Sequence, residues 1–146
     1  MARAVRIVAV ASAGGHWVQL MRLRRAWAGL DITYVTTDPG LAELLRAEAA
    51  EAGEPAPRVE VVQEGNRWQK RKLARQLLQI FLVMARLRPD AVITTGAAPG
   101  YFALRFGKML GARTIWIDSI ANAEELSLSG QKIGRYADLW LTQWPH

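Results

Sequence analysis

The side chain near the N-terminus that is best suited to acid–base chemistry is His16, which follows two glycines at the end of an apolar run. Residues 5–11 read VRIVAVA, which is typical of a buried strand in a parallel sheet, and a helical pattern begins at Trp17. Gly14 and Gly15 lack a Cβ, so their backbone can adopt a positive φ and let a ligand approach closely. The free N–H groups of the first helical turn then suit a phosphate or diphosphate, beside Ser12 and His16.

A structural interpretation of this loop stays open beside the phosphate-binding one, because two glycines can also serve only to make the turn. The segment ASAGGH lacks the G-x-G-x-x-G spacing of a dinucleotide-binding loop. Gly107 and Lys108 are followed by Met109, where a Walker loop has serine or threonine. Neither of these two nucleotide-binding motifs is therefore indicated.

Two further strand ends carry unusual chemistry. Residues 95–100 read TGAAPG, a second glycine loop that contains Gly96 and Gly100. The run TIWID at residues 114–118 ends on Asp118 and is followed by Ser119, Asn122 and Glu124. Because ligands of parallel sheets lie beyond the carboxyl ends of the strands, we expect these segments to converge with the loop that holds His16.

The elements that position these loops follow from the alternation of apolar runs and helical periodicity. Besides the first run, the pattern predicts strands over residues 31–36, 59–62, 91–94, 114–118 and 138–142, and helices over residues 17–28, 41–52, 68–87, 101–110 and 131–137. This alternation predicts an α/β fold, a Rossmann-like parallel sheet of about six strands with helices on both faces. The length of 146 residues predicts a single domain over residues 1–146.

Composition excludes several classes of function. The chain has no cysteine and two histidines, so we expect no thiolate chemistry, no metal site and no cofactor. The net charge of +6 favours an anionic partner. The basic residues do not interleave with aromatic ones as in a nucleic-acid reading module, and we expect no nucleic acid partner. We find no signal peptide and no apolar run long enough to span a bilayer.

The helix predicted over residues 68–87 begins with a basic cluster and becomes apolar. The first interpretation is an amphipathic crossover helix that packs on the sheet. The second is that Arg67, Trp68 and the four cations that follow contact an anionic membrane surface, with the indole ring at headgroup depth. These four cations are Lys70, Arg71, Lys72 and Arg75.

Several segments together carry a family resemblance. AGGH at residues 13–16 and TGAAPG at residues 95–100 resemble the two glycine loops in the N-terminal half of MurG-type GT-B glycosyltransferases. More specific are IDS at 117–119, LSLSG at 126–130 and ADLWLTQWP at 137–145. These resemble the acceptor-side subunit of the split N-acetylglucosaminyltransferase of N-glycan assembly and its bacterial exopolysaccharide relatives of the PssD type.

The resemblance implies that the chain is the N-terminal, acceptor half of a GT-B fold divided between two polypeptides and active only with its partner. The chain would bind a polyprenyl-diphosphate-linked sugar at the cytoplasmic, inner face of the membrane, as a peripheral protein. It would recruit a donor-binding partner subunit, which resembles the C-terminal half and holds most of the nucleotide sugar, a UDP-sugar. The acceptor and its diphosphate would be contacted by Ser12, Gly14, Gly15, Gly96, Gly100, Ser119, Asn122 and Glu124.

The resemblance places His16 at the acceptor hydroxyl as a possible general base, and an imidazole can take a proton at neutral pH. Asp118 could orient that imidazole or act as the base itself, and the sequence does not decide between the two. The alternative function is an autonomous nucleotide- or dinucleotide-binding α/β domain, against which the missing fingerprints argue.

Overall fold

The computed structural model describes residues 5–27, 29–64, 68–117 and 137–141. Strands and helices alternate along this part of the chain, as predicted. The elements are β1 (Arg6–Val10), α1 (Gly15–Arg22), the 3₁₀ helix η1 (Arg24–Trp27), β2 (Asp31–Thr36), α2 (Pro39–Ala52), β3 (Arg58–Val61), α3 (Lys70–Leu87), β4 (Ala91–Thr94), α4 (Ala97–Met109), β5 (Arg113–Ile117) and β6 (Leu139–Leu141). Most of the helix expected over residues 131–137 lies outside the described residues.

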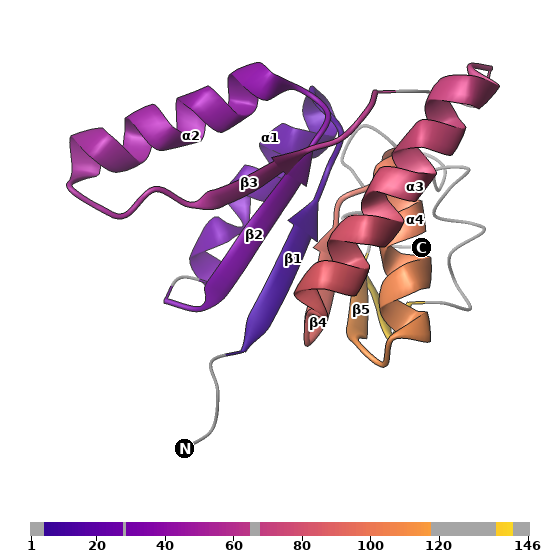
Figure 1. Ribbon diagram of the computed structural model, residues 1–146. Coiled ribbons are helices and arrows are strands. Elements are labelled where there is room, and N and C mark those ends of the chain that lie inside the picture. Colours follow the sequence, from indigo (N-terminus) through magenta and orange to yellow (C-terminus); the bar gives the residue numbers. More distant parts are fainter. Residues whose placement is uncertain (1–4, 28, 65–67, 118–136, 142–146) are drawn as a thin grey trace.

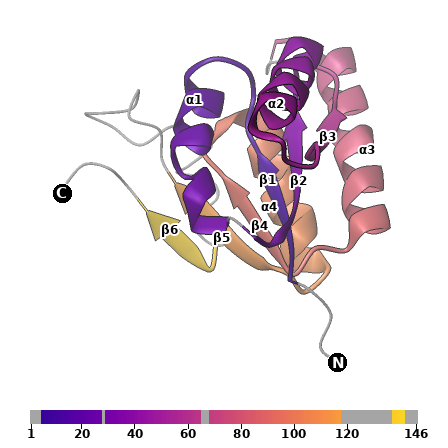
Figure 2. The same ribbon diagram turned by 90° about the vertical axis from the view of Figure 1, so that its left-hand side faces the viewer.

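The strands form one sheet in the order β3-β2-β1-β4-β5-β6, and every neighbouring pair is parallel. Five strands of four to six residues make up its body, and the three-residue β6 extends the edge beyond β5 (Figure 2). The predicted α/β fold class with a parallel sheet is confirmed. The chain runs outward from β1 to β3 and then returns to the other side of β1, so the strand order reverses between β1 and β4. Ligands of such sheets bind at this switch point, beyond the carboxyl ends of the strands.

Both faces of the sheet are covered by helices (Figure 1). On one face, Val8 and Val10 of β1 share a buried cluster with residues of α3 and α4, including Ile80, Met84 and Leu104. On the other face, Ile7 and Ala9 share a cluster with residues of α1, η1 and α2, namely Trp17, Leu20, Trp27 and Leu45. This double coverage explains why the first strand is an unbroken apolar run rather than an alternating one.

Two predicted helix boundaries are wrong by four or more residues, for identifiable reasons. The helix expected over residues 17–28 ends at Arg22, and the 3₁₀ helix η1 follows. The change from an α-helix to a 3₁₀ helix places Trp27 in the core, where its Nε1 donates a hydrogen bond of 3.0 Å to the hydroxyl of Tyr34. Helix α4 begins at Ala97 rather than at Tyr101, with Gly96 as its N-cap. Pro99 therefore lies in the first turn, where its missing N–H would have no partner within the helix.

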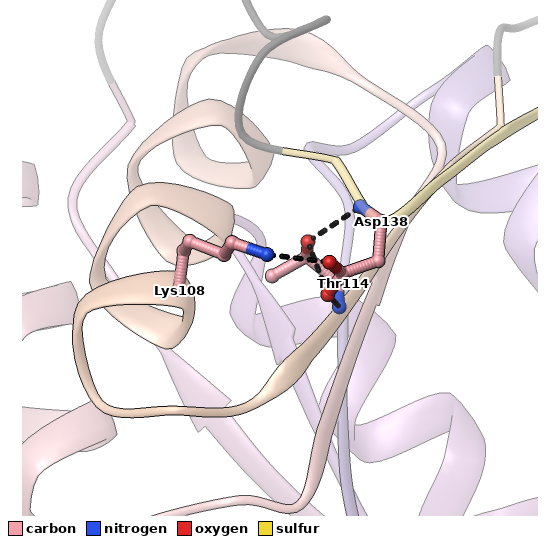
Figure 3. A network of polar contacts seen from close by, with 3 residues as sticks. All are labelled: Lys108, Thr114 and Asp138. Carbon is pink, nitrogen blue, oxygen red and sulfur yellow. Dashed lines mark hydrogen bonds and ion pairs between the residues drawn. The ribbon is translucent and has the colours of Figure 1, made fainter.

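Asp138, just before β6, ties this edge strand to β5 and α4 (Figure 3). Its carboxylate accepts hydrogen bonds from the backbone N–H and the hydroxyl of Thr114, at 2.9 and 3.2 Å, and pairs with the ammonium of Lys108. The backbone N–H of Asp138 donates in return to the carbonyl oxygen of Thr114, at 2.9 Å. The hydrogen bond from Lys108, followed by that from the Thr114 backbone, holds the pKa of Asp138 below its ordinary value of 3.8.

We predict that Asp138→Asn lowers the free energy of unfolding at neutral pH, and that its difference from wild type disappears in acid. A carboxyl whose pKa is lowered by folding stabilises the fold fully above 3.8, and this contribution is lost as the pH falls through the lower folded-state value. Urea unfolding of both proteins through a pH series measures the difference. Lys108→Met should remove part of the same pH dependence, and a wild-type minus variant difference that stays constant with pH would contradict the account.

Candidate functional site

The site lies at the carboxyl ends of the paired strands β1 and β4. Val10 and Thr94, the last residues of the two strands, lie opposite each other in the parallel register. The buried hydroxyl of Thr94 donates to the carbonyl oxygen of Val10 at 2.6 Å and accepts from the N–H of Gly96 at 3.1 Å. The segments that follow β1 and β4 therefore leave the sheet side by side.

His16 contacts the residue that follows β4. Its Nδ1 lies 3.0 Å from the carbonyl oxygen of Thr95, and the hydroxyl of Thr95 donates a hydrogen bond of 2.5 Å to the carbonyl oxygen of His16. Thr95 is buried and His16 is half-buried. Two of the three segments that we expected to converge do meet, over residues separated by 79 positions in the chain.

Gly96 gives the His16 ring its space. A Cβ at position 96 would lie 2.8 Å from Nδ1 and 2.9 Å from Cε1 of the imidazole, closer than real Cβ atoms approach. Gly96 also has a φ of +134°, which side chains disfavour. At Gly14 the surrounding space is open and the requirement is the backbone alone, with a φ of +88°.

The N-termini of two helices lie at this switch point. Gly14 is the N-cap of α1 and Gly96 is the N-cap of α4, and neither helix has a side-chain cap or an acidic residue in its first turn. Gly14 and Gly15 are exposed. First-turn N–H groups with the positive ends of two helix dipoles behind them suit an anion.

Gly100 has a packing role rather than a place in a loop. It lies inside α4, is buried, and faces β4: a Cβ there would come 2.1 Å from the hydroxyl oxygen of Thr94. Its missing side chain lets α4 approach the strand that anchors the site. Ser12 is half-buried in the turn between β1 and α1. The other predicted residues of this rim, Asp118, Ser119, Asn122 and Glu124, lie outside the described residues.

Thr95 is the residue of this site that the sequence analysis did not single out. It belongs to the loop TGAAPG, but its contacts with His16 can be recognised only once β4 is known to pair with β1. The signal available in the sequence was its position directly after the last residue of a predicted strand.

A second surface lies on α3. Lys70, Arg71, Lys72 and Arg75 are exposed on its first turns and form no ion pair with any residue that the structure describes. An exposed apolar stripe continues from them along the helix: Leu77, Leu78, Phe81 and Leu82, at 38–58 % exposure. We call these eight residues the α3 patch. Trp68 precedes it and is 78 % exposed, while Arg67 lies outside the described residues.

The α3 patch lies on a different face of the helix from the residues that pack against the sheet. Gln76, Ile80, Val83 and Met84 are buried toward the sheet, as a crossover helix requires. The exposed stripe lies outside this buried set, although Phe81 of the stripe also packs against Phe106 of α4. The signal of the stripe in the sequence is the pair of adjacent apolar residues that recurs four positions later.

Other kinds of site find little support in the described part of the chain. It holds no group of three or more histidine, cysteine, aspartate or glutamate residues that could bind a metal ion. Nor does it contain a helix long and apolar enough to cross a bilayer. A cavity of about 430 Å³ lies among η1, β2 and α2, lined by residues such as Arg25, Trp27 and Tyr34, and it contains none of the predicted site residues.

Comparison with solved structures defines the class of fold. MurG from Acinetobacter baumannii superposes with a TM-score of 0.69 at 15 % identity, over 97 % of this chain and 42 % of that one. The UDP-GlcNAc 2-epimerase from Methanocaldococcus jannaschii gives a TM-score of 0.63 at 12 % identity, over 94 % of this chain and 39 % of that one. The chain thus has the fold of one half of a GT-B glycosyltransferase.

Comparison with curated proteins finds relatives among transferase subunits. The UDP-N-acetylglucosamine transferase subunit ALG14 of Eremothecium gossypii is 27 % identical over an alignment of 155 positions. This alignment covers 90 % of this chain and 69 % of that subunit. The subunit of the same name from Yarrowia lipolytica is 33 % identical over 64 residues, 40 % of this chain and 30 % of that one. No protein-family model matches the chain. The chain is a homologue of the ALG14 subunits, as the resemblance implied.

We predict that Gly100→Ala destabilises the protein by about 1–3 kcal/mol, because the added methyl group must displace Thr94 or push α4 off β4. The free energy of unfolding in urea measures this. Gly15→Ala is the matched control: Gly15 is also helical, but no atom lies within 4 Å of the added Cβ, so its stability should change by less than about 1 kcal/mol. Equal losses in the two variants would contradict the packing role of Gly100.

Proposed function

We propose that this chain is the acceptor-binding subunit of a two-chain glycosyltransferase of oligosaccharide or polysaccharide biosynthesis. The observation that carries the proposal is the meeting of His16 with the start of α4 at the switch point, in a homologue of UDP-N-acetylglucosamine transferase subunits. Because the curated relatives are named as subunits of a transferase, we infer that a donor-binding GT-B partner supplies the remainder of the site. That partner would hold most of the nucleotide sugar.

The acceptor that fits this site is a sugar linked to a polyprenyl diphosphate. Its diphosphate would accept hydrogen bonds from the first-turn N–H groups of α1, where Gly14 and Gly15 leave the backbone accessible, and from the start of α4. The first turns of both helices lack carboxylates, so no side chain of these turns repels the anion. Ser12, Ser119, Asn122 and Glu124 stay proposed contacts of the acceptor.

Transfer needs a base at the acceptor hydroxyl, and we assign His16 to it, with Asp118 as the alternative. The acceptor O–H bond breaks, and its proton passes to the base. The acceptor oxygen forms a bond to the anomeric carbon of the donor sugar. The bond from that carbon to the diphosphate oxygen breaks, and its electron pair leaves on the nucleoside diphosphate.

The α3 patch is the surface we propose for contact with an anionic membrane, as a peripheral protein on its inner, cytoplasmic face. Lys70, Arg71 and Lys72 lie on the first turn of α3, where cations oppose the helix dipole at a cost of about 0.3–1 kcal/mol each. Anionic headgroups would relieve this cost, while Leu78 and Leu82 would enter the interface. Arg67 and Trp68 belong to the same proposed surface.

An autonomous nucleotide-binding domain is the second candidate, and the strand order favours it, since dinucleotide-binding sheets share the order found here. The loop ASAGGH lacks their glycine spacing. Binding of NAD or ATP by the isolated chain, without any partner, would support this candidate over the glycosyltransferase subunit.

We predict that the chain alone transfers no sugar and that adding a donor-binding GT-B subunit restores transfer from a nucleotide sugar to a polyprenyl-diphosphate sugar. His16→Gln should lower the transfer rate of the pair by about 10²–10⁴-fold, because the base is lost, while leaving partner capture unchanged. Asp118→Asn in the same assay tests the alternative base. Turnover by the chain alone, or an unchanged rate in both variants, would contradict the proposal.

We predict that replacing Lys70, Arg71, Lys72 and Arg75 by glutamine weakens binding to vesicles of anionic phospholipid by roughly 100-fold or more, since each cation near the surface contributes about 1 kcal/mol. Vesicle co-sedimentation measures this. The matched control neutralises four exposed arginines elsewhere, Arg46, Arg58, Arg88 and Arg113, and should lose much less affinity. Equal losses would show that only net charge matters and would rule out the α3 patch as the contact.

A further inference from the structure

We propose that Thr95 and Gly96 are positioning residues for His16, which hold its neutral imidazole with the proton on Nδ1 and leave Nε2 as the basic nitrogen. This inference rests on the proposed function, because it specifies how the base is presented to the acceptor hydroxyl. Its evidence is the contact between the loop after β1 and the loop after β4.

The proton position follows from the partner of Nδ1. The carbonyl oxygen of Thr95, 3.0 Å away, has no hydrogen and can only accept, so Nδ1 must donate. A neutral imidazole carries one ring proton, and Nε2 is then left with a free lone pair. Nε2 has no hydrogen-bond partner among the residues that the structure describes.

Thr95 holds His16 at two points. Its carbonyl oxygen receives the ring N–H, and its hydroxyl donates to the backbone carbonyl of His16 at 2.5 Å. The second bond fixes the backbone from which the ring extends. A ring turned over by half a rotation would place a carbon where Nδ1 now lies and would lose the first bond.

Gly96 determines which part of the ring is covered. A Cβ built at position 96 would be 2.8 Å from Nδ1 and 2.9 Å from Cε1 but 3.8 Å from Nε2. The backbone of Gly96 thus lies closest to the Nδ1 side, and any side chain there must displace the ring. The N–H of Gly96 is itself held by Thr94, which is bonded to Val10, so the position of the ring is tied to the β1–β4 pair.

The proton position can be measured directly on the full chain without any partner. Nitrogen-15 NMR distinguishes protonated from bare imidazole nitrogens, and the two histidines of the chain are told apart with His16→Gln. In the wild type at a pH where the ring is neutral, we expect His16 to carry its proton on Nδ1. Thr95→Ser, which keeps the hydroxyl, should preserve this pattern, whereas Thr95→Val should give a mixture of the two tautomers.

Gly96→Ala should lose the Nδ1–H pattern, because the methyl group occupies the place of the ring. Gly111→Ala is its control: Gly111 also has a positive φ, +86°, but open space around the added Cβ, so the His16 signals should stay those of the wild type. A wild-type His16 with its proton on Nε2, or a Thr95→Val spectrum identical to that of Thr95→Ser, would overturn the proposal.

Transfer kinetics of the reconstituted pair separate this proposal from the function on which it rests. Thr95→Val should lower kcat by about 10- to 100-fold with little change in the KM for the acceptor, and Thr95→Ser should restore it. If His16→Gln leaves the rate unchanged, the assignment of the base fails although the tautomer stands. If His16→Gln is slow but Thr95→Val is as fast as wild type, the positioning role fails and the function stands.

Discussion

The hydrogen bond from the Thr94 hydroxyl to the Val10 carbonyl joins the last residues of β1 and β4. The residues of the site follow these two strand ends, so their positions depend on this hydrogen bond. The same hydroxyl receives the N–H of Gly96, which fixes the start of α4, and Gly100 leaves the space that this hydroxyl occupies. His16 can then reach Thr95 across the switch point. Because every one of these groups is within a few residues of a strand end, a small shift of β4 against β1 would separate the histidine from the second helix.

The two helix N-termini at the switch point and the basic first turn of α3 lie at the same end of the fold. In Figure 1 the first turn of α3 is at the end of the sheet toward which the arrowheads of β1 and β2 point. The N-termini of α1 and α4 follow the carboxyl ends of β1 and β4 at that end. Peptide dipoles at the switch point and side-chain cations on α3 therefore favour anions at one end. A lipid-linked diphosphate, which carries its own anion close to a membrane surface, suits this arrangement.

Much of this fold could be predicted from the sequence, because the strands are short apolar runs bounded by turn residues. The predicted bounds of β2 and β4 match the structure. Asp38 caps α2 by accepting a hydrogen bond of 2.9 Å from the N–H of Gly40. The start of α4 was predicted four residues too late, since Gly96 and Pro99 are loop signals unless the helix is known to begin between them. The sequence also did not show which apolar residues of α3 are exposed. The apolar residues at 77 and 78 give the same helical pattern whether they are buried or exposed.

The site was predictable only in part. Gly14, Gly15 and His16 follow from the strand–turn–helix pattern, but the contact of His16 with Thr95 depends on a pairing between segments 79 residues apart, which no local signal carries. Gly96 was predicted to shape a loop, and the structure shows it beside the imidazole ring. Gly100 was predicted for the same loop and lies buried in α4, because the sequence does not distinguish a glycine that admits a ligand from one that admits a neighbouring strand.

The proposed function requires the N-termini of α1 and α4 at the switch point to bind the diphosphate of the acceptor. Titration of the 15N-labelled chain with a short-chain prenyl diphosphate, followed through the backbone amide signals, measures this binding. We expect saturable shifts concentrated at Gly14, Gly15, His16 and the first turn of α4, with the rest of the spectrum unchanged. Shifts confined to the cavity between η1 and α2, or spread over the basic surface without saturation, would contradict the claim.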